Sequence, residues 1–233
     1  MWYSHTAVLH YNKTTKKAAP TGTSGREGDA VDVQTFCTQV LKVTEPEALR
    51  QCIGAIRVLN LHKGQVLLAC GEPVTDVYFI KQGVLRGYYF DENGREITEC
   101  ISGTPGMAFM PGFDWHEPAR INIGAAAADT QVFAIPVELA DAMMANRPEI
   151  RQVYVEQIKL AGEIYLKARN ALLEGAALQR YQWFLRNYPG VADQVSGKII
   201  ASFLGITPVT LSRLRRSMRQ KAQEQGGGRK APT

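Results

Sequence analysis

One short segment near the C-terminal end combines hydroxyl, guanidinium and apolar side chains in a helical spacing. This is TPVTLSRLRR, from Thr207 to Arg216. If its leucines turn inward, the outward face of the helix carries Val209, Thr210 and Arg213. A guanidinium can form two parallel hydrogen bonds to a guanine edge, and small apolar groups can contact the thymine methyl. The segment therefore predicts contact with the base edges of a nucleic acid.

A helix of this kind must be held by a partner helix and a tight turn, and the preceding residues meet those needs. In GKIIASFLGITPVTLSRLRR, Ala201 is small where the two helices would cross, and Gly205 permits a positive φ at the turn. Thr207 suits the N-cap of the second helix and Pro208 its first turn. The apolar residues for the buried side are Ile200, Leu204, Ile206, Leu211 and Leu214. The pattern predicts a helix-turn-helix.

Other polar residues around the two helices would lie near phosphates. Ser196 and Lys198 open the first helix, and Arg219 continues the basic side of the second. Arg213 is the expected base contact, whereas Lys198 and Arg215 are expected at the phosphate backbone. The predicted DNA-binding residues are Ser196, Lys198, Thr207, Val209, Thr210, Ser212, Arg213, Arg215 and Arg216.

The charge of the chain is concentrated at the same end. The 233 residues carry a net charge of +5, but the residues from Ala176 to Thr233 include ten Lys or Arg against two Asp or Glu. The rest of the chain is therefore net negative. This asymmetry favours a C-terminal module that meets a polyanion. The alternative, from charge alone, is a solvated basic tail.

The middle of the chain has the pattern of an antiparallel β-domain. Short apolar or alternating runs, IRVLNL, QVLLAC, DVYFIK, VLRGYYF, EITECI and QVFAIP, are separated by glycine-containing turns. Asn93-Gly94 predicts a tight hairpin turn with both residues at positive φ. A short helix over Pro46 to Ile56 precedes the strands. These features predict a jelly-roll-like β-roll.

A helical period replaces the strand pattern between Pro148 and Gly175. Apolar residues repeat every seven positions in two series, Tyr154, Ala161 and Ala168, and Ile158, Tyr165 and Leu172. A seam that contains alanines favours two helices packed side by side, and hence a homodimer. The alternative is an amphipathic helix that lies on its own domain.

The expected fold class is α+β, with an antiparallel β-roll sensory domain, a long dimerisation helix and a C-terminal helix-turn-helix domain. The expected domains are a flexible tail (1–32), the β-roll (33–147), the dimerisation helix (148–175), the helix-turn-helix domain (176–220) and a flexible basic tail (221–233).

Two stretches of the sequence resemble the Crp/Fnr family of bacterial regulators. They are LHKGQVLLACGEPVTDVYFIKQGVLRGYYFDENGREIT and YQWFLRNYPGVADQVSGKIIASFLGITPVTLSRLRR. Gly64, Gly71, Gly83 and Gly94 fall where that family turns its β-roll. The resemblance extends from about Val33 to Gln220. It implies a homodimer on the long helix that binds a pseudo-palindromic DNA site.

The resemblance also places a candidate effector pocket at Gly106, Met107, Phe109 and Arg120. Members of the family that bind cyclic nucleotides hold the ribose and phosphate with a Gly-Glu pair and an Arg-Ser or Arg-Thr pair. Here Met107 replaces the glutamate, which leaves a ribose hydroxyl without a strong acceptor. Arg120 could still hold an anion. We therefore expect either an unknown effector or none, rather than a cyclic nucleotide, and no cofactor.

The recognition segment departs from the family as well. Pro208 and Val209 stand where its best-known members carry Arg and Glu, so we expect a different half-site. The N-terminal cysteine cluster of oxygen-sensing members is absent from the sequence. The cysteines present, Cys37, Cys52, Cys70 and Cys100, lack the spacing of a zinc or cluster site. They are interpreted as free thiols in a reducing cytoplasm, with a Cys37–Cys52 redox pair as the alternative.

The sequence offers little support for an enzyme. A cupin-like metal oxygenase needs a His-x-His pair with further ligands, and His5, His10, His62 and His116 do not have that spacing. The polar cluster Asp114-Trp115-His116-Glu117 is interpreted as a loop with surface side chains. We expect no metal site.

The expected protein is a cytoplasmic regulator without a membrane segment, because no apolar run reaches about 18 residues. Its expected partners are double-stranded DNA and a second copy of the chain, with RNA polymerase and a small-molecule effector as further candidates. The alternative function is a ligand-binding β-roll that regulates a protein partner without DNA.

Overall fold

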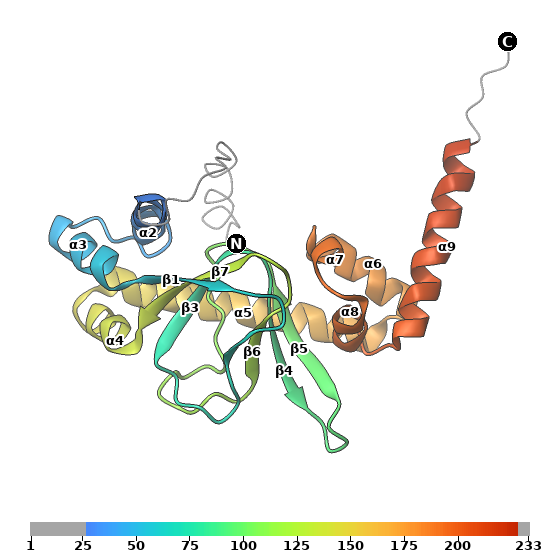
Figure 1. Cartoon of the computed structure of the whole chain (residues 1–233), viewed down its shortest axis with the longest axis horizontal. Coiled ribbons are helices and arrows are strands. Elements are labelled where there is room, and N and C mark those ends of the chain that lie inside the picture. The colour runs from blue at the N-terminus through green and yellow to red at the C-terminus, as the bar shows by residue number, and fades with distance from the viewer. Residues whose placement is uncertain (1–26, 228–233) are drawn as a thin grey trace, which may run out of the picture.

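The computed structural model describes residues 27–227, which form a β-domain, a long helix and a small helical domain (Figure 1). The elements are α2 (Glu27–Gln39), α3 (Pro46–Ala55), β1 (Arg57–Leu61), β2 (Val66–Leu68), β3 (Asp76–Gln82), β4 (Leu85–Phe90), β5 (Glu96–Ser102), β6 (Asn122–Ala125), β7 (Thr130–Pro136), α4 (Val137–Asn146), α5 (Pro148–Glu174), α6 (Ala177–Asn187), α7 (Val191–Gln194), α8 (Gly197–Phe203) and α9 (Pro208–Gly227). In Figure 1, α5 runs along the β-domain and α6 to α9 lie beyond its far end. The predicted α+β fold class is confirmed.

The strands form two antiparallel sheets with an apolar core between them. One sheet has the order β1-β7-β3 and the other β2-β6-β4-β5. Ile80, Leu85 and Ile123 are fully buried in this core. All six predicted strands are present. Strand β6 was not predicted, because its sequence NIGA is short and carries a single large apolar residue.

A second apolar core lies on the other face of the β1-β7-β3 sheet, where helices cover it. Along β3, Tyr78 and Ile80 belong to the core between the sheets, whereas Val77 and Phe79 pack toward the helices. This burial of both faces explains why β3 is a continuous apolar run. Phe36 of α2 stacks on Phe133 of β7, with 4.3 Å between ring centroids.

Helix α2 begins at Glu27, so residues 27–32 are helical and do not belong to a tail. The rest of the predicted tail, residues 1–26, lies outside the described residues. Helix α3 agrees with the prediction for Pro46 to Ile56, and Glu45 caps it by accepting from the backbone amides of Glu47 and Ala48. Helix α4 was not predicted.

The β4–β5 turn differs from its prediction in one respect. Gly94 has a φ of 72°, but Asn93 does not have a positive φ. Instead, the carboxylate of Asp91 accepts hydrogen bonds from the backbone amides of Asn93 and Arg95, each at 2.9 Å. This is a longer turn, with a single left-handed glycine, rather than a two-residue turn with two positive φ angles.

The long helix lies against its own chain more extensively than the heptad pattern predicted. Helix α5 begins at Pro148 and buries Ile150, Val153 and Gln157 against the β-domain. Of the predicted seam, Ala168 is buried in the core of the C-terminal domain, and Leu172 packs against that core. Part of the seam therefore serves intrachain packing, in line with the alternative interpretation of this helix.

The C-terminal domain comprises α6 to α9 around a core that includes Phe184, Ile200 and Leu211. Helix α9 continues to Gly227, so residues 221–227 are helical although the sequence predicted a flexible tail there. None of the helices within residues 27–227 is both long and apolar enough to cross a membrane.

Candidate nucleic-acid interface

Helices α8 and α9 form the predicted helix-turn-helix. Ser196 caps α8 by accepting a hydrogen bond from the Ile199 amide. Ala201 is fully buried at the crossing, and Gly205 takes a φ of 62° in the turn. The amide of Ile206 donates to the carbonyl of Ala201 at 3.0 Å, which closes the turn. The local requirements inferred from the sequence are therefore met.

The start of α9 is held by two threonines. The hydroxyl of Thr207 accepts from the Thr210 amide at 3.0 Å, and the two hydroxyl oxygens lie 2.8 Å apart. Thr207 is thus an N-cap that stabilises the first turn of α9. Thr210 shares its hydroxyl with this cap, which reduces its capacity to contact a base.

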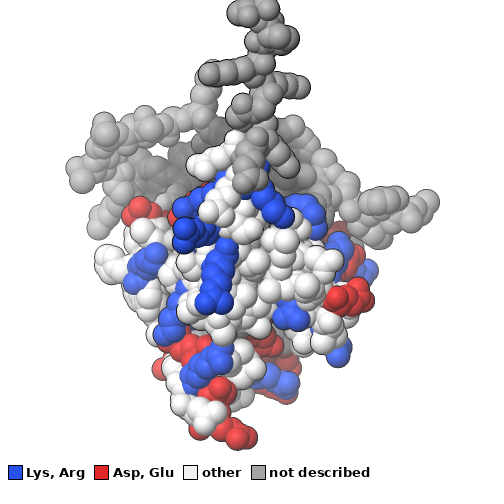
Figure 2. Space-filling model, turned by 90° about the vertical axis from the view of Figure 1, so that its right-hand side faces the viewer, with Lys and Arg blue, Asp and Glu red and all other residues white. Residues whose placement is uncertain are grey.

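The outward side of α9 remains exposed. Val209, Ser212, Arg213 and Arg216 are all exposed, whereas Leu211 is buried. Figure 2, which looks onto this end of the molecule, shows Lys and Arg side chains over the upper and central part of the face. Asp and Glu lie mainly toward its lower and right-hand margins, with a few at the upper left. The face that carries the helix-turn-helix is therefore positive.

A groove of about 590 Å³ runs between the start of α8 and one side of α9. Among the residues whose side chains the structure describes, the groove is lined by no acidic residue, and by Gly197, Lys198, Pro208, Leu211, Ser212, Arg215, Arg216, Arg219 and Gln220. Four cations along one groove would repel one another unless anions neutralised them. Phosphates of a nucleic-acid backbone supply such charge at regular intervals.

Arg215 is positioned by a residue that the sequence did not reveal. Its Nε donates to the hydroxyl of Tyr181 on α6 at 3.0 Å, and its guanidinium lies 5.7 Å from the centre of that ring. The side chain is half-buried, with its Nη1 near the position that a Cβ on Gly197 would take. Tyr181 thus fixes the guanidinium at the edge of the groove.

A second arginine joins the long helix to the turn of the helix-turn-helix. Arg180 of α6 donates from Nε to the carbonyl of Gly175, just beyond α5, at 2.7 Å. It also donates from Nη1 to the carbonyl of Leu204, at the end of α8, at 3.2 Å. One guanidinium therefore satisfies the ends of two helices, and couples the position of α8 to that of α5.

The β-domain also contacts the helix-turn-helix directly. Ser202 of α8 accepts from the Thr98 amide at 2.9 Å and donates to the Glu96 carbonyl at 3.2 Å. Both backbone groups belong to β5, an outer strand of its sheet. A side chain of α8 thus occupies hydrogen-bonding groups of an edge strand, and α8 lies beside β5 in Figure 1.

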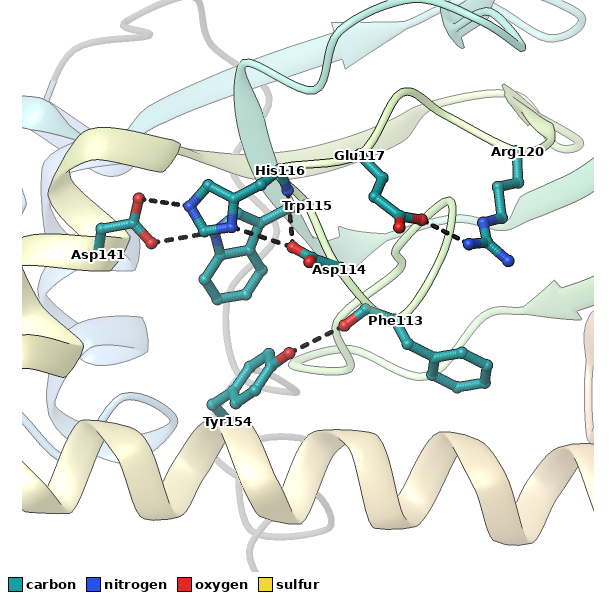
Figure 3. Close-up of polar contacts among 8 residues, drawn as sticks. All are labelled: Phe113, Asp114, Trp115, His116, Glu117, Arg120, Asp141 and Tyr154. Atoms are coloured by element: carbon teal, nitrogen blue, oxygen red, sulfur yellow. Dashed lines mark hydrogen bonds and ion pairs between the residues drawn. The ribbon is translucent and has the colours of Figure 1, made fainter.

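The four expected effector-pocket residues are divided between the core and the surface. Phe109 is buried between the sheets, and Met107 is buried with its sulfur 3.3 Å from the Ser102 hydroxyl. Gly106 has a φ of 79° and forms the turn before them. Arg120 is exposed and forms an ion pair with Glu117 (Figure 3). An anion at Arg120 would therefore compete with this carboxylate.

The Asp114–Glu117 loop is more structured than the sequence suggested. His116 is exposed, with Nδ1 3.0 Å from the Asp114 carboxylate and Nε2 3.0 Å from that of Asp141 on α4 (Figure 3). The hydrogen bond to Asp141 has the largest effect and the one to Asp114 the next largest, and both raise the pKa of His116 above its usual value. Trp115 is buried rather than on the surface, and its Nε1 donates to Asp141 at 3.1 Å.

The cysteines are all free thiols. Cys37 and Cys52 are buried where α2 meets α3, and a hydrogen bond to Cys52, together with burial, raises the pKa of the Cys37 thiol. Burial raises the pKa of Cys100 to about 12. Within the described part of the chain, no cluster of His, Cys, Asp and Glu is arranged to hold a metal ion.

Comparison with known proteins finds relatives that share this fold. No family model matches the chain. A curated relative, the anaerobic regulatory protein of Aggregatibacter actinomycetemcomitans, is 26% identical over 166 residues, covering 66% of this chain and 63% of that protein. The chain thus matches less than two thirds of that relative's length.

Solved structures share the fold. FixK2 from Bradyrhizobium japonicum has a TM-score of 0.64 and 19% identity, covering 72% of this chain and 86% of FixK2. A transcriptional regulator of the Crp/Fnr family from Eubacterium rectale has a TM-score of 0.61 and 16% identity, covering 76% and 85% of the two chains. These similarities show the fold, and they agree with the resemblance read from the sequence.

Proposed function

We propose that this chain, whose fold is that of the Crp/Fnr-type regulators, is a sequence-specific DNA-binding transcription regulator that acts as a homodimer on a pseudo-palindromic site. One observation carries the proposal. Helix α9 is capped at its start, exposes Val209 and Arg213, and lies beside a groove whose described lining has four cations and no acid. A recognition helix in the major groove needs this combination of a rigid start, an exposed edge and flanking phosphate contacts.

In the proposed complex, the start of α9 enters the major groove. Val209, which is 60% exposed, contacts a thymine methyl, and Arg213 donates two hydrogen bonds to a guanine. Lys198, Arg216 and Arg219 line the groove and bind phosphates. Arg215 is held by Tyr181 through Nε, so its remaining amino groups make the phosphate contact.

The long helix supplies a surface for the second copy. Tyr165, Leu166 and Leu173 of α5 are 52%, 57% and 70% exposed. Leu166 and Leu173 lie seven residues apart and therefore on one side of the helix. Burying such residues between two copies of α5 would present two α9 helices to successive turns of DNA.

Selection of bound sequences from random duplex DNA tests this function. The expected result is an inverted repeat whose half-sites lie about 10 base pairs apart, or a multiple of that spacing, as recognition by a two-fold dimer requires. Deletion of residues 197–233 should abolish the selection. If the intact protein enriches no sequence and shifts no DNA at low salt, DNA binding is wrong, and regulation of a protein partner becomes the better account.

The effector is proposed to be something other than a cyclic nucleotide. Met107 occupies the position of the ribose-binding glutamate, and its side chain is buried in packing. Arg120, the candidate phosphate ligand, is already paired with Glu117. Calorimetry with cyclic AMP and cyclic GMP is expected to show no tight binding. A micromolar dissociation constant for either nucleotide would contradict this proposal.

A further inference from the structure

A small apolar cavity lies between the β1-β7-β3 sheet and helices α4 and α5. Its volume is about 50 Å³. The sheet contributes Val77, Phe79 and Ile135, and α5 contributes Ile150 and Val153. The cavity therefore lies outside the core between the two sheets, and its lining does not include Met107, Phe109 or Arg120.

The loop between β5 and β6 also forms part of the wall of the cavity. Trp115 of this loop lines the cavity and packs edge-on against Tyr154 of α5, with 4.9 Å between ring centroids. Three polar contacts hold the loop in place (Figure 3). Trp115 and His116 both bind the Asp141 carboxylate, and the Tyr154 hydroxyl donates to the Phe113 carbonyl at 3.0 Å. His116 and the Tyr154 hydroxyl contact are exposed, so water can replace them when the loop opens.

The lining defines the chemistry of a ligand. Gln157 is the polar amide among the lining residues, and its oxygen already accepts from the Ala108 amide at 3.0 Å. A charged or strongly polar molecule would lose its hydration there without compensation. The walls include Met110, Met143 and Met144, whose flexible side chains adapt to different shapes.

We propose that this cavity binds a small, uncharged, apolar molecule, and that the Asp114–Glu117 loop is its cover. Apolar cavities in proteins stay dry and take up such molecules; one of about 150 Å³ binds benzene or xenon. At about 50 Å³, the cavity here holds a molecule of a few heavy atoms. A larger apolar ring requires Trp115 to move outward with its loop.

Occupancy of the cavity acts on the long helix. Ile150, Val153 and Tyr154 form one wall of the cavity and belong to the first turns of α5. The other end of α5 reaches Gly175, whose carbonyl is bound by Arg180. A ligand that shifts α5 thereby shifts the support of the helix-turn-helix. This regulatory step rests on the proposed function, whereas the binding step does not.

The binding step is tested with xenon on the full chain carrying 13C-labelled methionine methyl groups. Xenon is expected to shift the methyl signals of Met110, Met143 and Met144, and to leave Met218, in the C-terminal domain, unchanged. Ala140→Leu fills the cavity from α4 and should weaken xenon binding by at least about tenfold. Ala142→Leu, on the exposed side of α4, should bind xenon as the wild type does.

Each outcome bears on a defined part of the proposal. If xenon shifts none of the three methyl signals, or shifts them equally in Ala140→Leu, the site is wrong. Val153→Ile adds one methylene from the α5 wall and replaces Ala140→Leu if that variant does not fold, as judged by circular dichroism. Ala140→Leu should mimic an occupied cavity and change the affinity for the selected DNA, while Ala142→Leu should not. If Ala140→Leu loses xenon binding but keeps its DNA affinity, only the regulatory step is wrong. If neither the wild type nor any variant binds DNA, only the proposed function is wrong.

Discussion

At the scale of single residues, the exposed side of α9 separates base contacts from phosphate contacts. Arg213 is exposed on the helix surface, whereas Lys198, Arg215 and Arg216 line the groove beside it. Thr210, which sequence reasoning treated as a base contact, also pairs with Thr207 in the helix cap. The arginine at position 213 therefore has the strongest expected influence on sequence preference.

Arg213→Ala should weaken binding to the selected site by roughly 1–3 kcal/mol while changing random DNA much less, because a bidentate contact to guanine is lost. Lys198→Ala should weaken both DNAs alike and reduce the slope of log affinity against log salt by about one. Fluorescence anisotropy over a salt series, with the selected and a scrambled duplex, measures both effects. Equal losses on the two duplexes for Arg213→Ala would show that it binds phosphate.

The contacts of His116 make the stability of the Asp114–Glu117 loop sensitive to pH. The carboxylates of Asp114 and Asp141 face its two ring nitrogens and raise its pKa in the folded state. The ion pairs therefore stabilise the fold fully below the unfolded pKa of about 6.5, and this contribution is lost as the pH rises through the higher folded value.

The melting temperature of the wild type should accordingly exceed that of His116→Gln most at mildly acidic pH. The difference should vanish at alkaline pH, where the imidazole is neutral in both states. The exposed His62→Gln serves as the matched control. If the difference in melting temperature between the wild type and His116→Gln grew as the pH rose, the ion pairs of His116 would not explain it.

At the scale of elements, the junction between α5, α6 and α8 decides how the helix-turn-helix is held. Arg180 binds the carbonyl beyond the end of α5 and the carbonyl at the end of α8. Both are groups that a helix end leaves without an intrahelical partner. Ser202 provides a separate attachment of α8 to β5.

Arg180→Ala should lower the free energy of unfolding by about 1.5–3 kcal/mol, because charge-assisted hydrogen bonds are lost and two carbonyls lose a donor. Arg180→Lys should rescue it only in part, since one ammonium cannot reproduce the fork that reaches both carbonyls. Urea unfolding followed by circular dichroism measures the change. Arg186→Ala, an exposed arginine of the same helix, should remain within about 0.5 kcal/mol of the wild type. Full rescue by lysine would argue against the bridging role.

At the scale of the whole molecule, the exposed apolar side of α5 bears on assembly. Tyr154, Ala168 and Leu172 of the predicted seam pack against the chain itself, so a second copy must use the residues that remain exposed. Leu166 and Leu173 are the most exposed apolar residues of α5.

Leu166→Glu should shift the chain toward the monomer in sedimentation velocity, because like charges would meet near the two-fold axis. Its melting temperature at concentrations where the wild type is monomeric should change little, since the side chain is exposed. Ala142→Glu, on the exposed side of α4, adds the same charge outside this stripe and should leave association unchanged. A monomeric wild type at micromolar concentration, with and without DNA, would remove the dimer from the proposed function.

The sequence by itself determined the features that depend on neighbouring residues. A left-handed glycine at 205, a threonine cap at 207 and leucines at helical spacing are local requirements, and the helix-turn-helix follows from them. The alternating strands and the length of α5 are likewise set by the period of the apolar residues. Strand β6 (NIGA) and helix α4 (VELADAMMAN) were not predicted, because segments of four and ten residues are too short to show a clear period.

Only the tertiary structure decided which distant groups meet. His116 and Asp141 are 25 residues apart, and Tyr181 and Arg215 are 34 apart, so no local pattern joins them. For α5, the apolar stripe in the sequence indicates that one side of the helix is buried. It does not indicate whether the same chain or a second copy buries it. The fold assigns part of that stripe to the chain's own domains and leaves Leu166 and Leu173 exposed, since burial depends on the three-dimensional arrangement of every element around the helix.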